Sequence, residues 1–185
     1  MDGLPRLPLR RRVSGAGHES AALVAAQIGR SPREPWDVAA TCAFGFPTVI
    51  ASPPVLADGE RFPTAFWLTC PYLTEAVSTR ESAGAVADWN ARLAVEAGLV
   101  SRMRATDAAL RDARERLAGG ADVCGDVGIA GAAEAWSSAK CLHAHVALTL
   151  AGIDDPIGSA ELDTVPMPCP DERCARLPAR GEVVA

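Results

Sequence analysis

Four residues that can bind metals or take part in catalysis lie within six positions of the chain, in the segment KCLHAH. They are Lys140, Cys141, His143 and His145. Cysteine thiolates and histidine imidazoles are the usual protein ligands of zinc, and a Cys–His pair is also typical of enzymes with a thiolate nucleophile. The segment therefore indicates either a metal site or a catalytic cysteine.

Which histidine can act together with Cys141 depends on where the following helix begins. Apolar residues at helical spacing predict a helix that ends near Ala151. Its buried face comprises Leu142, Val146, Thr149 and Leu150. In a regular helix Cys141 and His145, four residues apart, share one flank of that face, whereas His143 lies on the other flank. Cys141 can act with His143 only if Cys141 precedes the first turn, and both arrangements remain open.

Two distant cysteines could complete a metal site. Cys42 and Cys70 fall where predicted strands end. If the sheet packs on the helix, these two thiols, Cys141 and one of His143 and His145 converge as a Cys₃His set. Such a set suits a structural zinc site or, less commonly, an iron–sulfur cluster. The simpler alternative is that free cysteines are buried as small hydrophobic residues and that the histidines are structural.

An enzyme is the second hypothesis. Cys141 would be the nucleophile, with His143 or His145 as base and Lys140 holding a small anionic substrate such as a phosphate or carboxylate. A position at a helix N-terminus beside a cation would favour the thiolate form of Cys141. The sequence contains no P-loop, no G-x-S-x-G elbow and no H-E-x-x-H helix.

The third hypothesis is a non-catalytic module that binds an unidentified protein partner through the arginine-rich helix 100–117. The charged residues of this helix are expected on its solvated faces. They are Arg102, Arg104, Asp107, Arg111, Asp112, Arg114, Glu115 and Arg116.

Three further cysteines receive no definite role from the sequence. Cys124 lies in a Gly-rich connection, residues 118–138, and a connection of that length is usually functional or mobile. Cys169 and Cys174 belong to the segment CPDERC, where we expect free thiols or an occasional disulfide.

The elements that must position these residues predict an α+β fold. The segments WDVAATCAF, FPTVIASPP and RFPTAFWLTC are β-branched and aromatic, and Asp58-Gly59 supplies a turn between the second and the third. They predict a small three-stranded antiparallel sheet packed against four to five helices. We expect one domain over residues 18–158, a disordered leader over 1–17, and a Pro-rich, mostly irregular tail over 159–185.

Composition narrows the class of protein. The chain has 185 residues, of which 49% are hydrophobic and 22% charged, as in a folded domain. Its net charge of -5 provides no general attraction to nucleic acid, which is therefore not an expected partner. No apolar run has the length of a membrane helix or a signal-peptide core. We expect a cytoplasmic protein without membrane association, whose six cysteines are thiols or ligands.

The order FGFPTVIASPPVLADGERFPTAFWLTCP, then helices, then KCLHAH and DDPIG resembles a bacterial, mainly actinobacterial, family labelled domain of unknown function number 501. The resemblance spans roughly residues 20–160. The matching positions are Cys42, Pro47, Pro63, Thr64, Cys70, Pro71, Lys140, Cys141, Leu142 and His143. At Asp155 this chain departs from the more usual NPIG, which leaves open the role of a side chain there. The resemblance implies no established activity; members are often encoded near enolase, a small septum-formation protein and an exopolyphosphatase, which implies housekeeping or cell division.

Overall fold

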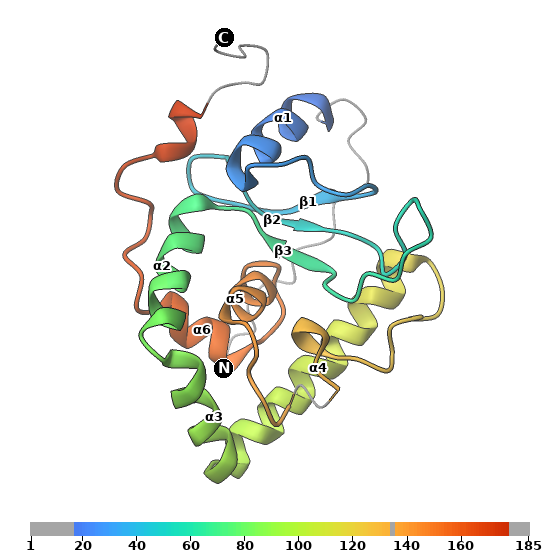
Figure 1. Cartoon of the computed structure of the whole chain (residues 1–185), viewed down its shortest axis with the longest axis vertical. Coiled ribbons are helices and arrows are strands. Elements are labelled where there is room, and N and C mark those ends of the chain that lie inside the picture. The colour runs from blue at the N-terminus through green and yellow to red at the C-terminus, as the bar shows by residue number, and fades with distance from the viewer. Residues whose placement is uncertain (1–16, 134–135, 178–185) are drawn as a thin grey trace, which may run out of the picture.

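The computed structural model describes residues 17–133 and 136–177, which form a small sheet surrounded by helices (Figure 1). The predicted leader lies outside the described residues except for Gly17, and so does the end of the predicted tail, 178–185. In chain order the elements are α1 (Gly17–Ile28), β1 (Asp37–Thr41), β2 (Pro47–Ala51), β3 (Phe66–Leu68), α2 (Pro71–Ser82), α3 (Ala85–Val95), α4 (Ala97–Ala118), η1 (Ile129–Gly131), α5 (Leu142–Leu150), α6 (Pro156–Leu162) and η2 (Arg173–Arg176).

The sheet confirms the predicted topology. Its three strands are antiparallel in the order β1-β2-β3. All five residues of the central strand β2 are buried, which explains why PTVIA contains no charge. The predicted turn lies between β2 and β3, and Gly59 there has a φ of 83°, a conformation that glycine adopts without steric cost.

The helices complete an α+β domain around α5. This helix packs against β2 and β3, and α6 packs against α5. Figure 1 shows α2 and α3 on one side of α5 and α4 on the other. The described part of the chain contains six α-helices, where the sequence predicted four to five, and the short helix α6 accounts for the difference.

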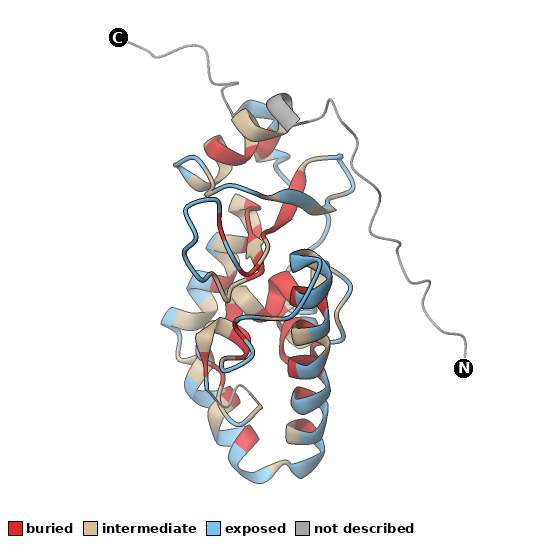
Figure 2. Cartoon of the chain, turned by 90° about the vertical axis from the view of Figure 1, so that its right-hand side faces the viewer, coloured by how far each residue is buried: buried red, intermediate tan, exposed pale blue. Residues whose placement is uncertain are grey.

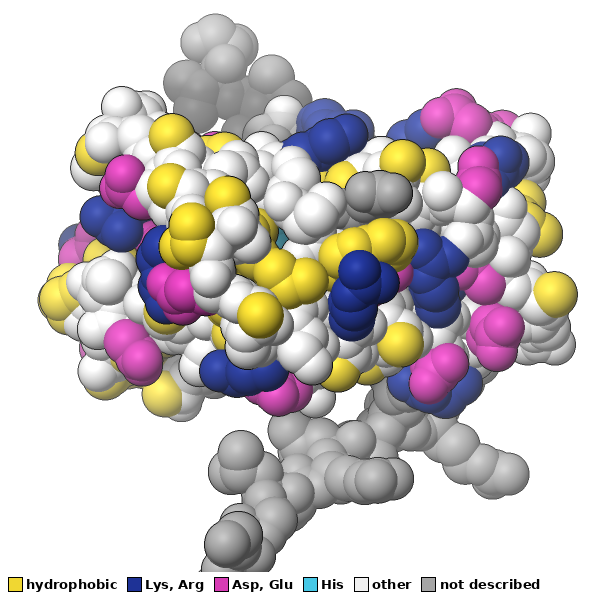
Figure 3. Space-filling view, turned by 90° about the horizontal axis from the view of Figure 1, so that it is seen from below, with side chains coloured by type: hydrophobic (Ala, Val, Ile, Leu, Met, Phe, Trp, Pro, Cys, Tyr) yellow, Lys and Arg dark blue, Asp and Glu magenta, His cyan; other side chains and the backbone are white. Residues whose placement is uncertain are grey.

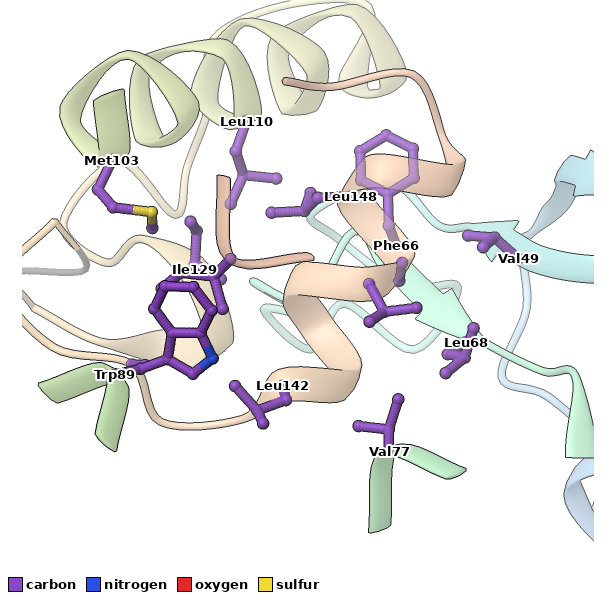
Figure 4. Close-up of a cluster of buried hydrophobic side chains, with 14 of the residues drawn as sticks. Val49, Phe66, Leu68, Val77, Trp89, Met103, Leu110, Ile129, Leu142 and Leu148 are labelled. Atoms are coloured by element: carbon purple, nitrogen blue, oxygen red, sulfur yellow. The ribbon is translucent and has the colours of Figure 1, made fainter. Parts of the chain in front are cut away.

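Helix α5 forms the centre of the hydrophobic core. Leu142 and Val146, two residues of its predicted buried face, are fully buried. Leu148 of α5 points towards Leu110 of α4 and Phe66 of β3 (Figure 4). Burying each such side chain contributes about 1.5–3 kcal/mol, so the core fixes the position of α5. Figure 2 shows that buried residues of the surrounding helices lie on the sides that face this core.

Helix α6 begins at the end of the predicted domain and continues into the segment from residue 159 onward, where the sequence predicted mostly irregular backbone. Asp155 caps this helix, because its Oδ1 accepts hydrogen bonds of 2.9 Å from the backbone N–H groups of Ile157 and Gly158. Pro156 occupies the first turn, where proline is favoured. An asparagine can provide the same cap, so the DDPIG segment retains this role of the more usual NPIG. Seven residues are too few for hydrophobic periodicity to reveal the helix.

The charged residues of α4 are not all solvated, which corrects the prediction for that helix. Asp107 and Arg114 are buried. The guanidinium of Arg114 donates hydrogen bonds to Asp122 Oδ2 and to the carbonyl oxygens of Pro63, Cys124 and Val127. These hydrogen bonds hold the Gly-rich connection against α4. Hydrophobic spacing alone did not predict this, because a buried ion pair has the sequence pattern of a solvated one.

Apolar and charged side chains mix on the surface. On the face seen from below, Lys and Arg side chains lie against hydrophobic ones, with Asp and Glu interspersed (Figure 3). Arginines also cover tryptophan rings: Arg92 lies 4.4 Å from the ring centre of Trp89, and Arg104 lies 4.5 Å from that of Trp136. Such cation–π contacts shield aromatic surface. Within the described ranges, no helix combines the length and apolarity needed to cross a membrane.

Candidate metal centre

Three potential metal ligands meet where the end of α2 approaches the start of α5. Glu81 lies in the last turn of α2, Cys141 is the N-cap residue of α5, and His143 lies in the first turn of α5. One oxygen of Glu81, the sulfur of Cys141 and one ring nitrogen of His143 all lie within 4.8 Å of one another. Over residues 17–133 and 136–177, this is the one group of three or more Cys, His, Asp or Glu side chains with such spacing.

The distances within this group lie close to those that a zinc ion requires. The Sγ of Cys141 is 3.8 Å from Nδ1 of His143, and that nitrogen is 3.3 Å from Oε1 of Glu81. A tetrahedral zinc ion holds its N and O ligands at about 2.0–2.2 Å and its sulfur ligands at about 2.3 Å, which places neighbouring ligand atoms roughly 3.3–3.7 Å apart. The three atoms can therefore bind one ion with little movement.

The other ring nitrogen of His143 has its own partners. Nε2 lies 3.2 Å from the carbonyl oxygen of Thr74 and 3.2 Å from the hydroxyl of Ser78, both on α2. When Nε2 carries the proton, its N–H donates to the Thr74 carbonyl. The lone pair of Nδ1 then faces Cys141 and Glu81. Metal-binding histidines are commonly oriented in this way by a backbone carbonyl.

Glu81 links the two helices as well as facing His143. Its Oε1 accepts a hydrogen bond of 2.6 Å from the backbone N–H of Leu142, the first residue of α5. The same carboxylate therefore stabilises the helix start that places Cys141 and His143. The side chains of His143 and Glu81 remain 24% and 28% exposed, and the neighbouring Lys140 is exposed, so solvent reaches the site.

In the metal-free protein the pKa of His143 is raised from 6.5 to about 9. The hydrogen bond with Cys141 is the largest cause, the Glu81 carboxylate and the Thr74 carbonyl act in the same direction, and partial burial opposes them. His143 is therefore an imidazolium at neutral pH when no metal is bound. A metal ion must displace this proton, as is usual for histidine ligands.

This shift predicts a pH dependence of stability for the metal-free protein. Because the folded-state pKa of His143 lies above its unfolded value, the stabilisation is fully present below about pH 6.5 and is lost as the pH rises through about 9. We expect the free energy of unfolding to fall by about 1–3 kcal/mol over this window, allowing for partial exposure. Urea unfolding in the presence of a chelator measures it, and His143→Gln should flatten the curve. Equal slopes for both proteins would contradict the assignment.

The structure separates the two histidines of KCLHAH. Cys141 has an extended backbone, with φ at -149°, and precedes the first turn, so its partner is His143. His145 is fully buried, and its Nδ1 donates a hydrogen bond of 2.7 Å to Asp155 Oδ2, which is buried as well. His145 thus joins α5 to the cap of α6 and does not face Cys141.

Cys42 and Cys70 lie away from this group. Cys70 is the N-cap residue of α2, and Glu81 is in the last turn of the same helix, so about 16 Å of helix separates them at 1.5 Å per residue. Cys42 directly follows β1. The described residues therefore do not assemble the predicted Cys₃His set, and they bring together Cys141 and His143 alone of its members.

Sequence reasoning did not single out Glu81. It lies 60 positions before Cys141 and belongs to no recognisable motif with it. The chain contains 23 acidic residues, so a carboxylate alone gives no usable signal. Only the packing of α2 beside α5 reveals its role.

A comparison with family models gives one match. The model described as Protein of unknown function (DUF501) matches residues 38–163. This range includes Glu81, Cys141 and His143. No curated protein and no solved structure matches the chain. The chemistry of the site must therefore be judged from its own geometry.

Proposed function

The chain belongs to the DUF501 family of proteins of unknown function, and we propose that it binds a zinc ion through Glu81, Cys141 and His143. The observation that supports this is the separation of the donor atoms, 3.8 Å for sulfur to nitrogen and 3.3 Å for nitrogen to oxygen. Thiolate, imidazole and carboxylate are all ligands that zinc accepts.

The site offers three protein ligands, which distinguishes it from a closed structural centre. Structural zinc sites have four protein ligands, whereas sites with three keep a position for water or a substrate. The partial exposure of His143 and Glu81 leaves room for such a ligand. Zinc at such a position acidifies a bound water or polarises a carbonyl or phosphoryl oxygen. Lys140, the only lysine of the chain, is exposed beside Cys141 and would attract an anionic ligand.

The geometry favours metal binding over a Cys–His–Glu catalytic triad. In a triad the histidine contacts the nucleophile with one ring nitrogen and the carboxylate with the other. Here Cys141 and Glu81 both face Nδ1 of His143, while Nε2 faces the Thr74 carbonyl. The sulfur, the carboxylate oxygen and the ring nitrogen therefore all face one point, as the ligand atoms of a metal ion do.

Zinc titration tests the proposal. We expect the wild-type protein to bind one zinc ion at this site, and Cys141→Ser and Glu81→Gln each to weaken binding by at least about 100-fold, because even outer-shell partners of metal ligands contribute about 10–100-fold. Both changes should preserve the fold: serine is a favoured N-cap residue, and glutamine retains an oxygen for the N–H of Leu142. Isothermal titration calorimetry of the purified chain measures the affinities.

The matched control is Glu115→Gln, an equivalent change at an exposed residue of α4. It should leave zinc affinity unchanged. The proposal is wrong if the wild-type protein binds no zinc at micromolar concentrations, or if Cys141→Ser binds it as tightly as the wild type does.

A further inference from the structure

Four cysteines gather at the other end of α2, away from Cys141. Cys42 follows β1 and Cys70 begins α2, while Cys169 and Cys174 belong to the C-terminal segment that follows α6. Figure 1 shows this segment, in red, running alongside α2 and ending near α1. All four are free thiols; Cys70 and Cys174 are buried and the other two are half-buried.

Backbone hydrogen bonds place Cys42 and Cys70 on either side of the start of β2. The N–H of Cys42 donates to the carbonyl of Phe46 at 2.9 Å, within the turn that leads into Pro47. The N–H of Cys70 donates to the carbonyl of Thr48 at 3.4 Å. Both cysteines are therefore held at the same end of the sheet, where β2 begins.

Cys174 is connected to the same place by Gln27 of α1. The side-chain amide nitrogen of Gln27 donates to the carbonyl of Pro47 at 2.8 Å and to the Sγ of Cys174 at 3.3 Å. Pro47 pairs with Thr41, the residue directly before Cys42. The amide group of Gln27 thus connects Cys174 to the start of β2, next to Cys42.

Contacts with the first turns of α2 hold the remainder of the C-terminal segment, which contains Cys169. Arg173 lies over the ring of Tyr72 at 5.3 Å and forms an ion pair with Glu75. The hydroxyl of Tyr72 donates to the carbonyl of Pro166 at 2.9 Å. The segment is therefore fixed on both sides of Cys169, across the end of α2 where Cys70 lies.

We propose that Cys42, Cys70, Cys169 and Cys174 bind an iron–sulfur cluster through four thiolates. Four cysteine thiolates are the standard ligand set for such clusters. Two of these ligands lie within the range matched by the family model, and two lie beyond it.

The spacing of the sulfurs distinguishes a cluster from a single zinc ion. Four thiolates on one zinc lie roughly 3.8 Å apart, given Zn–S bonds of about 2.3 Å. Within the part of the chain that the structure describes, no three of these sulfurs lie within 4.8 Å of one another. A cluster in which each thiolate binds a different iron accommodates the wider separation. This site shares no residue with the proposed zinc site, so either can be absent without the other.

Anaerobic purification of the full chain, followed by reconstitution with ferrous iron and sulfide, tests this inference. We expect bound iron and acid-labile sulfide in equal amounts, with the broad visible absorption of a cluster. Cys169→Ser and the double variant Cys169→Ser/Cys174→Ser should lose both. Cys141→Ser should retain them, and the double variant should still bind zinc at Glu81, Cys141 and His143.

Three outcomes would overturn the inference. They are a wild-type protein that takes up no iron, an iron content unchanged in both serine variants, and stoichiometric zinc in place of iron at these four cysteines. Circular dichroism of the variants shows whether they fold. Cys169→Ser is the safer of the two, because Cys169 is half-buried and lies outside the regular elements.

Discussion

Replacing Arg114 with methionine is expected to lower the free energy of unfolding by about 3–5 kcal/mol, the range found when one partner of a buried ion pair is removed. The side chain of Arg114 is 0% exposed, and that of its partner Asp122 is 4% exposed. The variant would leave the Asp122 carboxylate buried without its cation. It would also remove donors from the carbonyl groups of Pro63, Cys124 and Val127.

Methionine keeps much of the apolar volume of arginine, so the loss reports on the polar contacts rather than on a cavity. Chemical denaturation of the two proteins at pH 7 measures it. The matched control is Arg116→Met, at an exposed position of the same helix, which should change stability by no more than about 0.5 kcal/mol. A loss below about 1 kcal/mol for Arg114→Met would show that water replaces the arginine without cost.

Arg114 also marks a limit of what the sequence could predict. The strands were predictable because PTVIA and its neighbours alternate with clear turn signals, and the long helices because their apolar residues recur at helical spacing. Neither pattern distinguishes a buried arginine from a solvated one. Burial of Arg114 depends on the Gly-rich connection folding back over α4, which is a tertiary contact.

Only the part of the candidate metal site that depends on local spacing was predictable from the sequence. Local spacing identified Cys141 and His143, because both lie at the start of one helix, and it left the choice between His143 and His145 open. The choice depended on which residue begins α5, and Leu142 does so, with Glu81 accepting its N–H. Glu81 itself could not be predicted, since its contact joins two helices that are distant in sequence.

The expectation that Cys42 and Cys70 meet Cys141 rested on the sheet packing against α5. The sheet does pack there, but helix α2 separates the two ends. Its first residue follows Cys70, and its last turn carries Glu81 beside Cys141. The sheet thus packs against α5, as the hypothesis required. The sequence pattern did not show, however, at which end of α2 the two thiols lie.

Gly158→Ala is expected to destabilise the protein by about 3 kcal/mol or more, at the upper end of the range for overpacked cores. A Cβ atom at this position would lie 2.1 Å from the carbonyl oxygen of His145 and 2.4 Å from the hydroxyl of Thr149. Both atoms belong to α5, so α6 must move away from it. This movement would also weaken the hydrogen bond from the N–H of Gly158 to Asp155.

The control for this change is Gly98→Ala in α4, where an added Cβ meets no atom within 4 Å. Alanine is the better helix former by about 0.5–1 kcal/mol, so this variant should be more stable than the wild type. Opposite signs for the same chemical change would show that steric contact, and not helix propensity, governs position 158. Thermal or urea unfolding measures both variants, and a stable Gly158→Ala protein would contradict the close approach of the two helices.

The same variant tests what holds the zinc ligands in place. If Glu81 fixes the start of α5 through the N–H of Leu142, displacing α6 should leave the positions of Cys141 and His143 unchanged. The folded fraction of Gly158→Ala would then bind zinc with wild-type affinity, although the protein is less stable. Affinity that falls along with stability would instead mean that α6 positions the ligands through the whole length of α5.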